Sequence, residues 1–185
     1  GAIEPKAIAK AARERGFPAI AICDRNGLYG AMAFGDACKA AGVQPIIGAL
    51  LSVARPGQRL ANGAPQIDWL ALYAQDETGY GNLCALVSHA HLGRPVEMDP
   101  HVTLADMAGR TDGLICLTAG GEGALTRLLA GEQAVAANDY VEHLEALFAG
   151  RLYVEMARRG DAAEMAAEKA LIDLAYARAL PLVAT

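Results

Sequence analysis

Two acid and arginine pairs in this sequence could take part in chemistry. Asp24 and Arg25 follow the apolar run 19–23, and Glu155 lies in a second apolar segment, four residues before Arg159. Carboxylates can bind divalent cations, whereas arginines bind phosphate or neutralise carboxylates. Because parallel α/β folds place their sites at strand ends, Asp24 and Arg25 lie where such a fold would place a site.

The four histidines do not form a metal site by spacing. His89 and His91 lie two residues apart on a predicted helix, so their side chains point roughly 200° away from one another. We expect His101, in a loop, and His143, on a charged helix, to be ordinary exposed histidines. The sequence therefore predicts no histidine metal pair.

The cysteines are equally unlike a metal site. Cys23, Cys38, Cys84 and Cys116 lack the short paired spacings of structural zinc sites, and each lies among apolar residues. We expect plain buried thiols.

Composition limits the class of protein. The 185 residues are 54% hydrophobic and 20% charged, which fits one domain with a substantial core. No apolar run approaches the roughly 18 residues that span a bilayer, and the charged N-terminal segment is unlike a secretory signal. We therefore expect a cytoplasmic protein without membrane contact. A net charge of −5 also disfavours binding to nucleic acid by this chain alone, because the phosphates are negatively charged.

Apolar segments and turn residues predict six strands that alternate with six or seven helices. The predicted strands are 19–23, 46–53, 69–74, 113–118, 151–156 and 182–185. The main predicted helices are 5–16, 30–41, 78–91, 122–130, a helix through Phe148 capped by Asn138 or Asp139, and 161–179. The Gly- and Pro-rich segment 55–66 predicts a surface loop or hairpin. This alternation is typical of an α/β fold with a mainly parallel sheet, as a barrel or an open doubly wound sheet.

Four blocks of the sequence resemble one family in the same order. The first is AIAICDRNGLYGAMAFGDACKAAGVQPIIGALLSV, and the others are ALYAQDETGYGNLCALVSHAHL, TDGLICLTAGGEGALTRLLAGE, and RLYVEMARRG with LAYARALPLVAT. They resemble the PHP (polymerase and histidinol phosphatase) domain at the N-terminus of bacterial DNA polymerase III alpha subunits. The resemblance implies a single PHP domain over 1–185, folded as a distorted (β/α)7 barrel. Its first and last motifs are expected outside the chain, so the barrel would be incomplete at both ends.

The resemblance also implies that the family's metal cluster has degenerated. Asp24 of the second motif is kept, but Arg25 stands where metal-binding relatives have histidine, and Leu50 stands where they have glutamate. Trp69 and Arg159 fall near two further histidine positions. The degenerate cleft therefore comprises Asp24, Arg25, Leu50, Trp69, Glu155 and Arg159. We expect ion pairs there, with Glu155 bound to Arg25 or Arg159, and neither catalytic residues nor a metal.

By this resemblance the chain is expected to belong to a replicative polymerase, a DNA-directed nucleotidyltransferase that uses Mg²⁺ elsewhere in the parent protein. The domain would brace the rest of the alpha subunit and bind the proofreading exonuclease subunit, with DNA and other replicase subunits reached through the parent. The alternative is an active phosphoesterase using Zn²⁺ or Mn²⁺, as a proofreading nuclease or a pyrophosphatase. A self-contained phosphatase like histidinol phosphatase would share the fold but not these blocks.

Overall fold

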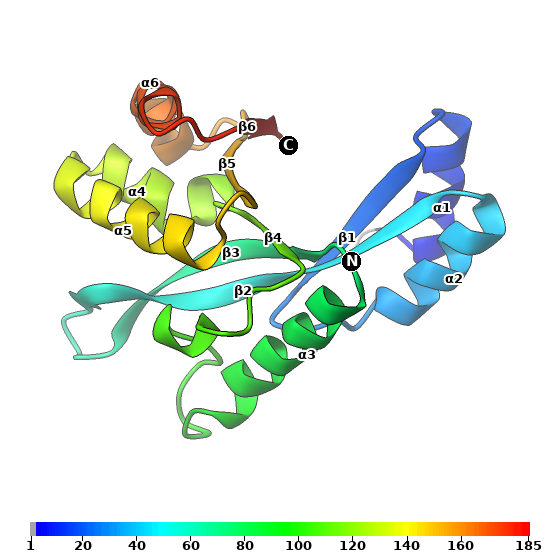
Figure 1. Cartoon of the computed structure of the whole chain (residues 1–185), viewed down its shortest axis with the longest axis horizontal. Helices are drawn as coiled ribbons and strands as arrows, with labels where there is room; N and C mark the ends of the chain where they lie inside the picture. The colour runs from blue at the N-terminus through cyan, green and yellow to red at the C-terminus, as the bar shows by residue number, and fades with distance from the viewer. Residues whose placement is uncertain (1–2) are drawn as a thin grey trace.

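A computed structural model describes residues 3–185, which form a curled six-stranded sheet with helices packed along it (Figure 1). The strands are β1 (Ala19–Arg25), β2 (Gln44–Arg59), β3 (Pro65–Ala74), β4 (Leu114–Leu117), β5 (Leu152–Met156) and β6 (Leu182–Ala184). The α-helices are α1 (Pro5–Glu14), α2 (Ala31–Ala41), α3 (Glu77–Leu92), α4 (Ala124–Ala130), α5 (Ala134–Leu147) and α6 (Ala162–Ala177). Two 3₁₀ turns are η1 (Ala105–Met107) and η2 (Gly120–Glu122).

The strands lie side by side in chain order, from β1 to β6. Three of the five strand pairs are parallel, β1–β2, β4–β5 and β5–β6, whereas β3 runs antiparallel to β2 and β4. The prediction of a mixed α/β fold with a mainly parallel sheet is confirmed. The curled six-strand sheet corresponds to an incomplete distorted barrel (Figure 1).

The segment predicted as a loop or hairpin is a hairpin, but its strands are longer than expected. β2 continues to Arg59 and β3 begins at Pro65. The pairing passes from Ala54 opposite Ile67 to Arg59 opposite Pro65, with a bulge between. A bulge can accommodate proline and glycine, so the Pro and Gly residues at 56 and 57 do not end the strand.

Side-chain caps begin two of the long helices. Asp161 accepts hydrogen bonds from the first turn of α6, as its position predicted, and Asp76 accepts one from Gly79 in α3. The predicted cap at Asn138 or Asp139 is wrong, because α5 begins at Ala134. The buried stripe of α5 continues upstream of the polar pair, so packing extends the helix past these residues.

Two apolar clusters hold the helices on the sheet. A small cluster joins α1 and α2 to β1 through Phe34, Cys38, Val43 and their neighbours. The larger cluster joins α3, α4, α5 and α6 to β2, β3, β4 and β5, with Phe148 and many leucines fully buried. Against this core, α3 approaches the start of β4 so closely that a Cβ on Gly79 would lie 1.8 Å from the Gly113 carbonyl oxygen.

The histidines and cysteines differ partly from expectation. His101 is only 4% exposed, so the prediction of an exposed loop residue is wrong, whereas His143 is exposed. The packing of the loop against the sheet buries His101, whose Nδ1 lies 2.8 Å from the Asp99 carbonyl oxygen. Cys38 and Cys116 are fully buried, and the other two cysteines are partly buried. None of the helices in residues 3–185 is long and apolar enough to cross a membrane.

Candidate functional site

Five of the six predicted cleft residues lie on β1, β2, β3 and β5, and Arg159 lies in the loop that follows β5. The strand residues do not all share one face of the sheet. Arg25 pairs with Leu50 in the parallel ladder, and Trp69 lies on the next strand. The guanidinium carbon of Arg25 is 4.6 Å from the centre of the Trp69 ring, a cation–π contact. Because side chains alternate along a strand, Asp24 belongs to the opposite face. Its carboxylate accepts a hydrogen bond from the Gly30 amide at 2.7 Å, which fixes the turn into α2.

Arg25 forms an ion pair that the sequence did not predict. Its Nη2 donates to both carboxylate oxygens of Glu122, at 2.7 and 2.8 Å. Glu122 lies in η2, 97 residues further along the chain. The Arg25 guanidinium is thus held between a carboxylate and an indole ring.

Arg159 is paired in a similar way with Glu164. Its Nη2 donates to Glu164 Oε1 at 3.0 Å, and its backbone amide donates to Oε2 at 3.2 Å. The Glu164 side chain is only 5% exposed and also accepts from the Gly121 amide at 3.2 Å. Burial would raise the pKa of Glu164, but the hydrogen bonds from Arg159 and Gly121 outweigh burial and lower the pKa. Glu164 is therefore a charged partner.

Glu155 forms neither of the ion pairs expected for it. Its Oε1 accepts a hydrogen bond from the Thr185 hydroxyl at 2.6 Å, and its amide donates to the Thr118 hydroxyl at 2.9 Å. Within the described chain, Arg25 and Arg159 take Glu122 and Glu164 instead. Both arginines thus form ion pairs, as expected, but the expected partner Glu155 is wrong. The glutamates that pair with them lie on η2 and α6.

A partly buried thiol, Cys23, lies next to Asp24 on β1. Burial raises the pKa of Cys23 to about 11, an effect that its hydrogen bond with Tyr73 only partly offsets, and the charges of Glu155 and Asp24 raise it further. A thiol must lose its proton to attack. The raised pKa therefore favours the protonated thiol at neutral pH and gives no support for Cys23 as a nucleophile.

A buried carboxylate, which the sequence did not single out, supports the loop that carries Glu122. Asp68 is 1% exposed and binds Arg55 through Nε and Nη2, at 2.7 and 2.8 Å. It also accepts from Arg127 Nη1 at 2.9 Å. Arg127 Nε in turn donates to the Gly121 carbonyl oxygen at 3.2 Å. The cleft loop is therefore attached to the β2–β3 hairpin through one carboxylate.

Unusual backbone conformations mark the ends of β1 and β4. Asn26 and Ala119 have φ angles of 45° and 62°, in the left-handed region that few residues other than glycine adopt. The Asn26 side chain compensates by accepting from the Ser52 amide and hydroxyl, both at 2.9 Å, and by donating to the Pro100 carbonyl oxygen at 3.3 Å. These bonds fix the strand end beside the cleft.

A further polar cluster lies away from the cleft, on the loop that follows α3. Asp106 accepts from the Thr103 amide and hydroxyl at 2.8 and 2.9 Å, and from Arg94 Nη2. Burial would raise the pKa of Asp106, but these bonds and the Arg94 charge lower it to about 2. His89 Nε2 lies 3.3 Å from Asp106 Oδ1, and His91 Nε2 lies 2.7 Å from the Asn26 carbonyl oxygen. His89 Nε2 forms no hydrogen bond with the described residues, and the two histidines face different groups.

The comparison with family models identifies the fold. The model described as "PHP domain" matches residues 1–159. The chain belongs to the PHP domain family. This PHP domain is 38% identical over 190 residues to DNA polymerase III subunit alpha of Caulobacter vibrioides, and 32% identical over 178 residues to that of Escherichia coli. These alignments cover 100% and 96% of the chain, but the chain spans only 16% and 15% of the two relatives.

A solved structure shows the same fold. A candidate metal-dependent phosphoesterase from Bifidobacterium adolescentis superposes with a TM-score of 0.62 and 14% sequence identity, covering 98% of the PHP domain and 80% of that chain. At this identity the likeness concerns the fold alone.

The residues of this PHP domain do not fit the metal cluster that the family implies. Within residues 3–185, no group of three or more histidine, cysteine, aspartate or glutamate side chains is placed to hold a metal ion. The two carboxylates nearest the cleft arginines are bound to them, and Leu50 and Trp69 supply no ligand atom. Two of the six predicted residues, Arg25 and Arg159, pair with glutamates outside that set: Glu122 lies 97 residues after Arg25, and Glu164 lies five residues after Arg159. The Gly-rich turn 120–123 was the one sequence signal for Glu122.

Proposed function

We propose that this PHP domain is a metal-free structural and interaction module of a replicative DNA polymerase III alpha subunit. The observation that carries this proposal is the pairing of Arg25 with Glu122 and of Arg159 with Glu164, where metal-binding relatives are expected to place histidines. The similarity to alpha subunits over the whole chain supports its place in DNA replication. Replication in bacteria would place it in the cytoplasm.

Electrostatics explains why the cleft is unsuited to a cation. An arginine stays charged at any physiological pH, and here its charge is balanced by one carboxylate. If Glu122 turned to a metal, Arg25 would be left without its partner. A divalent cation about 5 Å from that guanidinium would be repelled by about 7 kcal/mol at an effective dielectric constant of about 20. The cleft carboxylates are therefore already neutralised by arginines, where metal ions neutralise them in metal-binding relatives.

The proposal extends to partners. The domain would brace the rest of the alpha subunit and bind the proofreading exonuclease subunit, while DNA, other replicase subunits and Mg²⁺ would bind the nucleotidyltransferase parts of the parent. The alternative, a phosphoesterase dependent on Zn²⁺ or Mn²⁺, rests on one observation: Glu155 is kept and pairs with neither arginine.

Metal binding distinguishes the two functions. The single tryptophan of the sequence, Trp69, lies against Arg25 and reports on the cleft. Mn²⁺ quenches nearby tryptophan fluorescence, so we expect no saturable quenching of Trp69 and only substoichiometric metal after loading with Zn²⁺ or Mn²⁺ and desalting. Arg25→Ala, which exposes the indole, should change the emission and so shows that the reporter responds.

The same metal analysis on the complete alpha subunit tests whether flanking motifs alter the result. Stoichiometric metal there, with phosphodiester hydrolysis lost on Glu155→Gln, would overturn the metal-free proposal in favour of the phosphoesterase.

A further inference from the structure

Two asparagine–glycine pairs in the chain have opposite surroundings. Asn26 and Gly27 follow β1, whereas Asn62 and Gly63 lie in the turn between β2 and β3. In such a pair the glycine nitrogen can attack the side-chain carbonyl carbon of the asparagine, because glycine has no side chain to obstruct the approach and leaves the backbone free to turn. The attack expels ammonia. Its rate in a folded protein depends on how freely the two residues can rearrange.

Asn26 is held from outside its own segment. Its Oδ1 accepts hydrogen bonds from the amide and the hydroxyl of Ser52, both at 2.9 Å, and its Nδ2 donates to the Pro100 carbonyl oxygen at 3.3 Å. Gly27 is buried, and the Tyr29 ring covers it so closely that a Cβ on Gly27 would lie 2.2 Å from Tyr29 Cε2. Three hydrogen bonds to two other segments must therefore break before the Asn26 side chain can rearrange.

The Asn62 side chain bonds only to its own turn within residues 3–185. Its Oδ1 accepts from the Ala64 amide at 3.0 Å, and the Gly63 amide donates to the Leu60 carbonyl oxygen at 2.9 Å. Both Asn62 and Gly63 are exposed, and no atom lies within 4 Å of the place that a Cβ on Gly63 would take. A local opening of this turn therefore frees the attacking nitrogen and the side-chain carbonyl group together.

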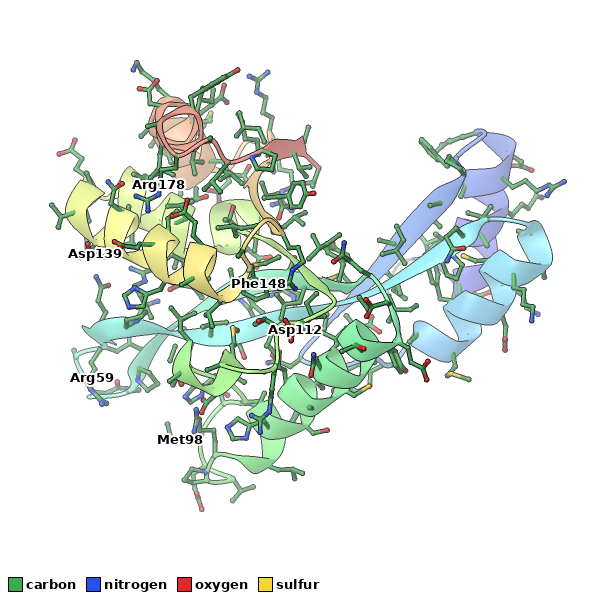
Figure 2. The ribbon with its side chains drawn as sticks, in the orientation of Figure 1. Arg59, Met98, Asp112, Asp139, Phe148 and Arg178 are labelled. Atoms are coloured by element: carbon green, nitrogen blue, oxygen red, sulfur yellow. The ribbon has the colours of Figure 1, made fainter. Side chains whose placement is uncertain are left out.

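The turn also lies apart from the cleft and is open to water. Figure 2 shows Arg59, which donates to the Gly63 carbonyl oxygen at 2.9 Å, at the end of the hairpin away from α1 and α2. An open cavity of about 390 Å³ extends from Asn62 to the loop 97–99, and none of the six cleft residues lines it. Exposed loop tips are where folds tolerate covalent change best.

We propose that Asn62 is a site of spontaneous deamidation in the folded protein and that the fold protects Asn26. The Gly63 nitrogen gives its proton to water or hydroxide and bonds to Asn62 Cγ. The bond from Cγ to Nδ2 breaks, and Nδ2 leaves as ammonia. Water then opens the cyclic imide at either of its carbonyl groups, which yields aspartate or isoaspartate. Water is the only co-reactant, and nothing is oxidised or reduced.

The product changes the charge and the backbone of the turn. Both routes replace a neutral amide by a carboxylate, beside the cavity that Glu97 and Asp99 also line. The isoaspartate route also adds a methylene group to the main chain between Leu60 and Ala64, whose amide and carbonyl groups are joined at 2.8 Å. We expect that hydrogen bond to be lost, whereas the pairing of β2 with β3 beyond the bulge remains. This inference does not rest on the proposed function.

Peptide mapping by mass spectrometry tests the proposal. The purified chain is incubated at pH 8 for days, and samples are digested with pepsin at low pH, where the released peptides react slowly. We expect Asn62 to convert at least roughly tenfold faster than Asn26, because three hydrogen bonds restrain the Asn26 side chain. In urea the two rates should become similar, since no fold then restrains either pair.

A variant separates local restraint from overall stability. Ser52→Ala removes one of the three hydrogen bonds of Asn26 and should raise the Asn26 rate without changing the Asn62 rate. Equal acceleration of both asparagines in this variant would assign the difference to global unfolding and overturn the local protection of Asn26. Equal rates in the folded parent chain, or an Asn62 that reacts only in urea, would overturn the proposal as a whole.

Discussion

The buried carboxylate of Asp68 should be among the most sensitive positions of this PHP domain. Its side chain is 1% exposed, that of Arg55 is 9% exposed, and three hydrogen bonds of 2.7 to 2.9 Å join it to Arg55 and Arg127. Asp68→Asn keeps the size of the side chain but leaves two guanidinium groups without their counter-charge. Removal of one partner from a buried pair typically costs about 3–5 kcal/mol. For a domain of this size, that loss corresponds to a melting temperature lower by about 6–20 °C.

Urea unfolding followed by circular dichroism measures this loss as a shift of the midpoint at constant slope. The matched control is Asp173→Asn, which breaks an exposed pair with Lys169 and should cost less than about 0.5 kcal/mol. If Asp68→Asn does not fold, Arg127→Met removes only the more exposed partner and should still cost more than the control. A cost of Asp68→Asn equal to that of the control would refute the argument.

Low pH, a glycine contact and the buried thiols each test a different part of the structure. Asp106 should contribute about 2 kcal/mol of stability above pH 4, because its pKa falls to about 2 on folding. Urea midpoints should show this contribution disappear between pH 4 and pH 2, and Asp106→Asn should lack that part of the pH dependence. Gly79→Ala should destabilise the fold by more than about 3 kcal/mol, because the added Cβ clashes with backbone, whereas Gly81→Ala, which has open space in the same helix, should be neutral or stabilising by up to about 1 kcal/mol. Melting temperatures of the two variants that move in the same direction would contradict this. A thiol reagent at pH 8 should leave Cys38 and Cys116 unmodified until urea unfolds the protein, since both are buried and burial raises both pKa values. Rapid reaction of either thiol in the native state would show that the core opens.

The order of elements could be predicted from the sequence because local signals dominate it. Asp161 caps α6 where an aspartate before an apolar stripe predicts a helix start. The same reasoning placed a cap wrongly at Asn138. The residues before it are mostly alanine, which gives little sign of a buried helix face, so a polar residue inside the helix resembled a cap. The length of β2 was also missed, because Pro56 and Gly57 resemble turn residues and the bulge that accommodates them depends on the pairing with β3.

The cleft could be predicted only in part. Arg25 and Arg159 were found because they replace expected ligands beside strand ends. Glu122 could not be found by spacing, since it meets Arg25 across 97 residues and only after β4 has been placed in the sheet, whereas Glu164 lies only five residues after Arg159. Asp68 and its arginine partners carry no short spacing that would mark them as a network in the sequence. Contacts between distant segments are therefore the part that sequence reasoning left undetermined.

The strands lie in the sheet in the same order in which they are synthesised, which bears on folding during synthesis. Each strand of residues 3–185 pairs with the strand synthesised just before it, so no strand has to be inserted between two that are already paired. Sheets with mainly local pairings close small loops and fold rapidly. During synthesis the described part of the sheet can therefore extend from β1 by one strand at a time, and its unpaired edges at each stage are those of β1 and the newest strand.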